Sequence, residues 1–528
     1  MICDLSQSDS IPVFEADVCI VGAGAAGLTL AAELVSQGQR VLLLESGGRE
    51  LEEKIQQLNQ IEKSGQPQKA PHLGRFRQLG GTAKRWGGQI LEMYDEDFSP
   101  RGWIPSSGWP IAKQVLHAFY ARALRAGGLS RVLATDVEVW QQLHRPVPQL
   151  DDNLVSYCTR WCPEPDLSRV YREMLQSPNL CIVLHATACA MPLNPDRASI
   201  AGVLCRDLVG NQKTFCAKKY VLCLGMLETI QLLLQPMPSG QLPWQSNGWL
   251  GKHVQSHIDY NAARLIPTCS ANRVKLQQYF SNIYLQSRKY HPKLRLSAEA
   301  QSDKQILSIA GAVTCISPVE LEVRQLKSTA RNLLRGNFSA IRLSHLIRVV
   351  RQIPLLARLG IGYLIHNRAH WYADGTLWLR VHCEQEPLSA SSITLSSERD
   401  ALGMFRSHLD WHVSPLEWKT IQSFAATVKT AFEAAGLATV ALQPELLRED
   451  GFRDVIFDDS YHWMGGTRMS VSADDGVVDP NLKIHGIDNA YVCSTSVFPT
   501  SGFSNPTHTL LALAIRLADH LAETKPNV

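Results

Sequence analysis

The order of apolar and polar positions is most informative near the N-terminus. Residues 18–21 (VCIV) form a short apolar run that is typical of a buried strand. Residues 28–37 (LTLAAELVSQ) have the composition and length of a helix, which Gly38 closes. Residues 41–44 (VLLL) form a second apolar run that ends at Glu45. The pattern predicts a strand, a turn, a helix and a second strand, in that order.

Weaker patterns predict further elements along the chain. Strands are predicted within 178–188, at the start of 216–234, within 373–395 and at 490–492. Helices are predicted within 48–72, within 106–124, in the second half of 216–234 and within 416–436. A last helix is predicted to run from 504–506 to about residue 522, with Asn505 as its N-cap and Pro506 in its first position.

The composition is that of a globular protein with several domains. The chain has 528 residues, of which 45% are hydrophobic and 19% charged. A net charge of +3 gives no reason to expect nucleic acid as a partner. The 13 cysteines have no repeated spacing, so reduced thiols are expected. Cys158 and Cys162 are the closest pair, and no second pair or histidine cluster accompanies them, so no metal site is expected.

The N-terminal residues MICDLSQSDS have neither the basic nor the apolar region of a secretory signal, so none is expected. No apolar run approaches the roughly 18 residues that a membrane span needs. We therefore expect a cytoplasmic protein.

The turn after the first predicted strand has the spacing of a dinucleotide-binding loop. Gly22, Gly24 and Gly27 form G-x-G-x-x-G between strand and helix. In such a loop the first glycine permits a tight turn, the second lets a pyrophosphate approach the backbone, and the third lets the helix pack against the strand. The helix N-terminus offers free N–H groups to the phosphates. Glu45, at the end of the second strand, is placed to bind ribose hydroxyls. The motif predicts an adenine dinucleotide without distinguishing FAD from NAD.

Two other stretches carry candidate chemistry. Residues 75–90 (RFRQLGGTAKRWGGQI) hold two Gly-Gly pairs around Trp86, which indicates a backbone that closely approaches another group. Residues 460–470 (SYHWMGGTRMS) place His462 ahead of a Gly-Gly turn. Taken alone, His462 fits a packed core histidine better than a catalytic base, so its role depends on the rest of the chain.

These pieces, in this order, resemble the glucose–methanol–choline (GMC) family of FAD-dependent oxidoreductases. The most specific match is C-terminal, where YHWMGGTRM is followed by GVVDPNLKIHGIDNAYV, SVFPT and NPT. The segment EQEPLSASSITLSSERDALGM also resembles the family's link into its C-terminal part. The resemblance covers nearly the whole chain and is strongest at 17–48, 78–90, 107–111, 217–234, 384–404 and 460–520.

The resemblance implies an α/β fold with two domains. One is a Rossmann-like FAD-binding domain with glutathione-reductase-like βαβ units, expected at 13–110, 178–258 and 472–525. The other is an α+β substrate domain on a mostly antiparallel sheet, expected at 111–177 and 259–471.

The resemblance also implies FAD rather than NAD, with His462 and Asn505 as the catalytic residues. The cofactor-binding residues that it implies lie in the glycine-rich loops, at strand ends and at the start of the last helix. They are Gly22, Gly24, Ala25, Ala26, Gly27, Glu45, Ser46, Gly80, Gly81, Thr82, Trp86, Gly87, Gly88, Ala188, Gly225, Ser494, Ser496, Asn505, Pro506 and Thr507.

Three positions depart from the family pattern or add to it. Some relatives attach the flavin covalently to a histidine just before the tryptophan of the Gly-Gly segment. Arg85 stands there in this chain, so we expect non-covalent FAD. Many relatives have an aspartate where this chain has Ser494, which leaves a carboxylate contact to the cofactor in doubt. His508 follows Asn505 by one helical turn and is expected to be a packed residue or a pocket wall rather than a second base.

The function implied is oxidation of a CH–OH group of a sugar, glycoside or other alcohol. His462 would remove the hydroxyl proton, because the pKa of a histidine lies near working pH. Asn505 would donate a hydrogen bond to the developing alkoxide. The electron acceptor, whether oxygen, a quinone or a redox protein, stays open. The alternatives are a flavoenzyme of the same fold with other chemistry, such as a fatty-acid photodecarboxylase or a lyase, and a catalytically silent flavoprotein subunit.

One segment is not explained by the resemblance. Residues 323–373 contain no Asp or Glu but nine basic residues among apolar ones. The basic residues are Arg324, Lys327, Arg331, Arg335, Arg342, Arg348, Arg351, Arg358 and Arg368. We expect a helical insert that caps the substrate domain with its basic face solvated. Peripheral membrane contact, an acidic partner and an anionic substrate are the alternatives.

Overall fold

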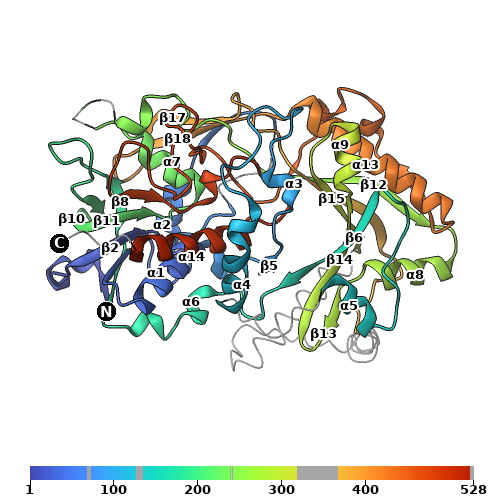
Figure 1. The fold of residues 1–528 in the computed structure, drawn as a ribbon, viewed down its shortest axis with the longest axis horizontal. Helices are drawn as coiled ribbons and strands as arrows, with labels where there is room; N and C mark the ends of the chain where they lie inside the picture. Colours follow the sequence, from blue (N-terminus) through green and yellow to red (C-terminus); the bar gives the residue numbers. More distant parts are fainter. Residues whose placement is uncertain (68–72, 127–134, 238–239, 241, 318–366, 524–528) are drawn as a thin grey trace, which may run out of the picture.

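The computed structural model describes residues 1–67, 73–126, 135–237, 240, 242–317 and 367–523. Two lobes lie side by side, and both chain ends belong to the lobe that holds α1, α7 and α14 (Figure 1). Helices α8, α9 and α13 belong to the other lobe.

The first lobe is built on a parallel sheet. Its strands, in spatial order, are β1 (Ile2–Asp4), β7 (Leu180–Leu184), β3 (Val41–Leu44), β2 (Ala16–Val21), β11 (Ala217–Leu222) and β21 (Ala490–Val492). Each neighbouring pair is parallel. Strands β3 and β7 are apolar throughout because helices and loops cover both faces of a parallel sheet. The predicted strand–helix–strand pattern is confirmed by β2, α1 (Ala25–Ser36) and β3.

Helices α14 (Thr507–Glu523) and α1 pack against each other, and α4 (His117–Ala126) packs on α14 (Figure 1). The predicted strand–turn–helix of 216–234 is confirmed by β11 and α7 (Met226–Leu234), with Gly225 at φ +85° between them. The last helix begins at Thr507, one residue later than predicted, which is within the usual uncertainty of helix ends.

Two predicted elements are wrong in extent. The strand expected within 178–188 is broken at His185, which has φ +53°, so β7 ends there and β8 (Thr187–Ala190) joins another sheet. That antiparallel sheet also holds β9 (Val203–Arg206) and β10 (Gln212–Phe215). The helix expected within 106–124 forms only from His117, after a 3-10 turn.

The second lobe is built on a large antiparallel sheet. Its strands, in spatial order, are β19 (Ala438–Leu442), β12 (Ile258–Pro267), β16 (Thr376–Cys383), β15 (Ile309–Ile316), β14 (Arg288–Leu296), β6 (Leu154–Trp161) and β5 (Gln89–Ile90), with β13 (Ile283–Leu285) on β14 and β20 (Asp458–Asp459) on β12. Helix α13 (Pro415–Ala434) packs on β12, β15, β16 and β19, and confirms the helix predicted within 416–436. Gly311 of β15 lies close to Phe424 of α13, so its neighbours in β15 face the other side of the sheet.

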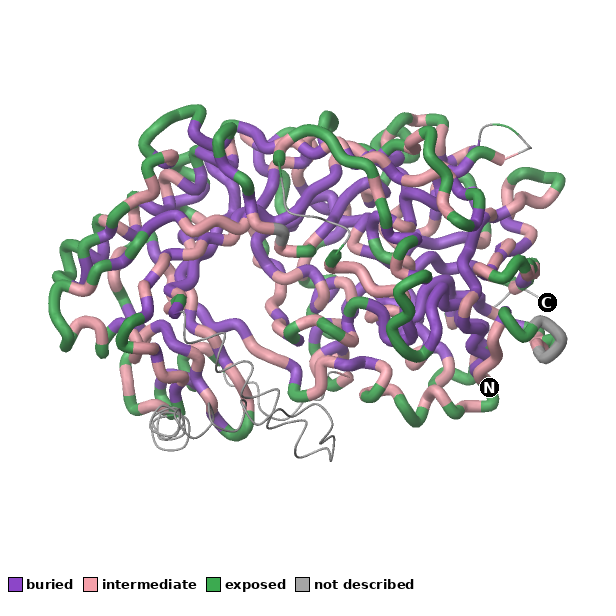
Figure 2. Tube along the Cα trace, turned by 180° about the vertical axis from the view of Figure 1, so that it is seen from behind, coloured by how far each residue is buried: buried purple, intermediate pink, exposed green. Residues whose placement is uncertain are grey.

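A small sheet of β17 (Ser392–Arg399), β18 (Phe405–Trp411) and β4 (Glu62–Gly65) lies against α7. Strand β4 lies inside the stretch 48–72, where a helix was predicted. The α-helix described there is limited to α2 (Glu53–Gln56). The remaining helices are α3 (Asp95–Phe98), α5 (Asp136–Gln142), α6 (Leu167–Val170), α8 (Ser270–Phe280) and α9 (Ala298–Lys304). Buried segments run through both lobes, and one apolar core cluster joins them (Figure 2).

The basic segment predicted at 323–373 lies mostly outside the described residues. Arg368, at its described end, does not belong to a solvated face, because its side chain is buried and donates to the Ser281 carbonyl at 3.0 Å. In the part of the chain that the structure describes, no helix has the length and apolar character needed to cross a membrane.

Candidate active site

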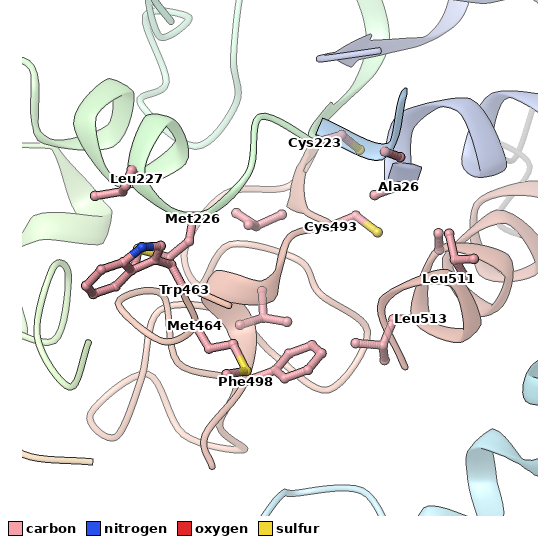
Figure 3. Close-up of a cluster of buried hydrophobic side chains, with 14 of the residues drawn as sticks. Ala26, Cys223, Met226, Leu227, Trp463, Met464, Cys493, Phe498, Leu511 and Leu513 are labelled. Atoms are coloured by element: carbon pink, nitrogen blue, oxygen red, sulfur yellow. The ribbon is translucent and has the colours of Figure 1, made fainter. Parts of the chain in front are cut away.

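A cavity of about 240 Å³ lies at the carboxyl ends of β2, β3, β11 and β21. This edge of a parallel sheet is where dinucleotides bind in doubly wound folds. Ala26, Cys223, Met226, Leu227, Trp463 and Cys493 line it, and the same side chains belong to the buried cluster of Figure 3. The cavity therefore has a rigid, packed wall.

The glycine-rich loop has the geometry that a dinucleotide needs. A Cβ at Gly22 would lie 2.6 Å from the Cys223 carbonyl oxygen, and one at Gly27 would lie 1.9 Å from the Gly22 carbonyl oxygen. Both glycines are required by close packing of loop, helix and strand. A Cβ at Gly24 would meet nothing within 4 Å, so the backbone there faces open space. Gly24 is also the N-cap of α1, without a side chain that caps the helix.

Glu45 lines this cavity and is held by two backbone groups. Its carboxylate accepts hydrogen bonds from the N–H of Ala23 at 3.0 Å and of Gly47 at 2.9 Å. Burial outweighs these bonds and raises the pKa of Glu45 to about 7. The position agrees with a role toward ribose hydroxyls.

Two cationic residues in this cavity were missed by the sequence analysis. Arg75 pairs with Glu228 of α7, and Arg77 donates to the Ser46 hydroxyl at 3.1 Å. Both precede the Gly-Gly pair of the quoted segment RFRQLGG, so their charge was the available signal. Trp463 also lines the cavity, and its buried Nε1 has no hydrogen-bond partner among the described residues. Open Gly24, two arginines and an unsatisfied donor fit a bound dinucleotide.

Most of the predicted cofactor residues line this cavity. They are Gly22, Gly24, Ala25, Ala26, Glu45, Ser46, Gly81, Thr82, Trp86, Gly225, Ser494 and Thr507. Ala188 lines a small adjoining pocket, and Gly87 and Asn505 line the larger cavity described next. The remaining predicted residues, Gly27, Gly80, Gly88, Ser496 and Pro506, line neither main cavity. Ser496 is buried, where its Oγ accepts from Thr467, so its contribution is to the local fold.

A second cavity of about 850 Å³ adjoins the first. The two share the lining residues Gly74, Phe76, Thr82, Trp86, Tyr461 and Thr507. One wall is the face of the large sheet that points away from α13. It presents Asp259, Arg380 and His382, Ala310 and Ala312, His291 and Lys293, and Trp161. The small residues of β15 leave room in the middle of this wall.

The structure places His462 and Asn505 together at the second cavity. Asn505 Nδ2 lies 3.2 Å from His462 Nε2, although the residues are 43 positions apart. The amide of Asn505 therefore faces the histidine, and the prediction that it caps the last helix gains no support. His257, which the sequence analysis missed, lies with its Nδ1 3.0 Å from His462 Nδ1.

These contacts are consistent with one set of tautomers. An amide NH₂ only donates, so His462 Nε2 accepts from Asn505. The proton of neutral His462 is then on Nδ1, which donates to His257 Nδ1. His257 keeps its own proton on Nε2, which lies 3.5 Å from the Ser501 carbonyl oxygen. The Nε2 lone pair of His462, which accepts from Asn505, is therefore the one at the cavity.

The electrostatics keep His462 neutral. Burial, together with His382 and Lys293, lowers the pKa of His462 to about 3, against the opposing effect of Asp259. Burial would raise the pKa of Asp259, but His382 and Arg380 outweigh it and hold that pKa well below its usual range. Asp259 accepts from His382 Nδ1 at 2.7 Å and from Arg380 at 3.0 Å.

Comparison with known proteins agrees with this arrangement. A family model described as GMC oxidoreductase matches residues 387–514, and one described as FAD dependent oxidoreductase matches residues 17–246. These two matches, with the relatives named below, support the predicted GMC family of FAD-dependent oxidoreductases. The predicted family, fold class and cofactor, FAD, are confirmed.

The similar proteins differ in how much of this chain they cover. The chain is 24% identical to 6'''-hydroxyparomomycin C oxidase of Streptomyces lividus over 96% of this chain and 92% of that protein. It is 41% identical to C-glycoside 3-oxidase of Microbacterium trichothecenolyticum over 66 residues, 12% of this chain and 13% of that protein. Its fold matches the crystal structure of pyridoxine 4-oxidase from Mesorbium loti with a TM-score of 0.56 and 15% identity, over 96% of this chain and 99% of that one.

Arg85 and His508, the two other positions singled out in the sequence, have different surroundings. Arg85 lines the larger cavity, beside Trp86. His508 lines neither main cavity; it is buried, and its Nε2 lies 3.3 Å from the Tyr120 carbonyl oxygen. Burial lowers the pKa of His508 to about 4. A packed role for His508 therefore agrees with its surroundings.

Proposed function

We propose that this protein oxidises a CH–OH group to a carbonyl at the junction of the two cavities. The observation that carries the proposal is the 3.2 Å contact between Asn505 Nδ2 and His462 Nε2 at the larger cavity. When bound, FAD supplies the acceptor for the hydride that leaves the substrate carbon. The oxidase names of the relatives described above support an alcohol-type substrate.

In this proposal His462 is the general base. Its Nε2 lone pair accepts the hydroxyl proton, since the other ring nitrogen is occupied by the hydrogen bond to His257. Asn505 donates from its amide to the same substrate oxygen as negative charge develops there. The N-terminus of α14 begins at Thr507, which lines both cavities, so its positive dipole end favours negative charge at their junction.

The lining of the larger cavity argues against one of the alternatives, a fatty-acid photodecarboxylase. A fatty-acid photodecarboxylase would be expected to have a hydrophobic tunnel. The wall here carries Asp259, Arg380 and Lys293, which suits a small polar substrate better than an acyl chain. Electrons would pass to oxygen, a quinone or a redox protein.

We also propose that FAD is held without a covalent bond, because Arg85 occupies the position before Trp86. Denaturation in detergent should release all yellow colour from the protein. Flavin that stays with the denatured chain would contradict this part.

The proposed function is tested by anaerobic addition of alcohols and sugars to the FAD-loaded protein. We expect one class to bleach the flavin band. We expect His462→Ala to keep FAD and to lose bleaching, while His508→Gln, which lines neither main cavity, keeps it. Bleaching that survives His462→Ala unchanged would exclude His462 as the base.

A further inference from the structure

One cation that lines the larger cavity, Lys293, pairs with no other residue in the part of the chain that the structure describes. Lys293 lies in β14 and lines the cavity together with His291, two positions before it, as the period of a strand requires. Among the described residues, no hydrogen bond or ion pair reaches the Lys293 ammonium. A buried charge that lacks a partner costs stability, so such groups are usually found where a ligand completes them.

The acidic side chain in the cavity lining that could neutralise Lys293 already has other hydrogen-bond partners. Asp259 is the only acidic residue among those that the structure describes in the lining. Its two oxygens accept from His382 Nδ1 at 2.7 Å and from Arg380 at 3.0 Å. Arg380 also lies 3.8 Å from Asp458. Asp259 is therefore already paired with Arg380 and His382, and it favours the Lys293 ammonium only through an electrostatic effect without a direct contact.

A second lining cation adds to the imbalance. Arg85 is exposed at the cavity, with its guanidinium 5.3 Å from the Phe76 ring centroid. The described part of the chain gives it no carboxylate partner. With Asp259 and Arg380 cancelling, Lys293 and Arg85 leave the cavity positive. Burial lowers the pKa of Lys293 to about 8, which still leaves most of the ammonium charged at neutral pH.

We propose that the substrate of this site carries a carboxylate, which pairs with Lys293 and with Arg85 while its CH–OH group faces His462. The inference rests on the proposed function and narrows it to hydroxy acids, such as a uronic acid. A neutral sugar would leave both cations without an anion, whereas a carboxylate can accept a charge-assisted hydrogen bond from each.

The test uses pairs of compounds that differ only in the acidic group. We would follow anaerobic flavin reduction with methyl glucuronide against methyl glucoside, and with 4-(hydroxymethyl)benzoate against benzyl alcohol. One charge-assisted hydrogen bond contributes about 1.5–3 kcal/mol, which is a preference of roughly ten- to a hundredfold in kcat/KM for the acid. Equal or lower kcat/KM for the acid in both pairs would overturn the inference.

Variants connect the preference to Lys293. Lys293→Met should lower the ratio of kcat/KM for the acid to kcat/KM for the neutral member, and Lys293→Arg should restore that ratio. Lys289→Met is the matched control, because Lys289 lies on the same strand over Trp161 at 4.0 Å and does not line the cavity. An acid-to-neutral ratio of kcat/KM that stays unchanged in Lys293→Met, with FAD content unchanged, would contradict anion recognition.

Binding without turnover separates this inference from the proposed function. Benzoate and benzamide can be titrated against the flavin spectrum of the FAD-loaded protein. Tighter benzoate binding that Lys293→Met abolishes supports the anion site even if no alcohol bleaches the flavin. Bleaching by neutral alcohols together with no benzoate preference would keep the oxidation and remove the anion site.

Discussion

At the scale of single residues, the base is defined by its hydrogen bonds rather than by its ring alone. His462 has two nitrogens, and only one can hold a free lone pair in the neutral form. The contact with His257 takes up Nδ1, and the Asn505 amide requires Nε2 to accept. The three residues come from different segments, at the start of β12, after β20 and before α14.

The pH dependence follows from the environment of His462. Only neutral His462 can accept a proton, and burial with His382 and Lys293 lowers its pKa to about 3. Activity that needs the neutral form is fully present above this pKa and is lost below it. We therefore expect kcat/KM for flavin reduction by a neutral alcohol to stay level between about pH 7.5 and pH 5. An acid limb centred near the ordinary histidine pKa of about 6.5 would contradict the buried environment.

His257 is expected to position the base. His257→Leu removes the acceptor for His462 Nδ1–H, so His462 can adopt the unproductive tautomer and the rate should fall. The fall should be smaller than the roughly 10²–10⁴-fold effect of losing the base itself. His257→Asn, whose side-chain oxygen can replace the acceptor, should recover much of the rate. Equal rates for His257→Leu and His257→Asn, with FAD bound to both variants, would exclude this role.

At the scale of elements, the glycines between β2 and the first turn of α1 have two different roles. Gly27 is needed for close packing, and Gly24 is expected to face the ligand. Gly27→Ala places a methyl group 1.9 Å from the Gly22 carbonyl oxygen, which is overpacking that costs about 1–3 kcal/mol or more. Gly24→Ala meets no protein atom within 4 Å. Thermal unfolding without FAD should show a lower Tm for Gly27→Ala alone. FAD titration should show weaker binding for Gly24→Ala, and unchanged affinity there would contradict the cofactor placement.

The two lobes differ in how much of their structure could be predicted from the sequence. The elements β2, α1 and β3 were predictable because their apolar runs and glycines are local. The wall of the larger cavity was not. Asp259, His382 and Lys293 come from three strands, and their shared face depends on pairing between distant segments. The alternation of β16 predicted a strand there, but a polar position that faces a cavity has the same pattern as one that faces bulk solvent, so its role was not visible.

At the scale of the whole molecule, one buried ion pair helps to join the lobes. Arg101, which follows α3, donates to the two oxygens of Glu384, which follows β16, at 2.7 and 2.5 Å. Both side chains are buried. Glu384 also accepts from the Ser308 N–H at 2.9 Å. The pair connects segments that lie 283 positions apart in the sequence.

Removing one partner should destabilise the protein strongly. Arg101→Met leaves Glu384 as a buried unpaired charge, which lowers the free energy of unfolding by about 3–5 kcal/mol. The double variant Arg101→Met/Glu384→Met should recover much of this. Lys429→Met is the control, because the Lys429–Glu433 pair of α13 is exposed and should contribute less than about 1 kcal/mol. A single variant no less stable than this control, by thermal unfolding, would show that the pair is dispensable.

The proposed reaction is removal of a proton from a substrate alcohol by His462, for which bound FAD would supply the hydride acceptor. The measurement that tests it most directly is single-turnover flavin reduction under anaerobic conditions, for the wild type and His462→Ala with equal FAD content. We expect an alcohol to bleach the flavin of the wild type, and we expect the rate of flavin reduction to be roughly 10²–10⁴-fold lower in His462→Ala. No bleaching by any alcohol, or an equal rate in both proteins, would contradict it.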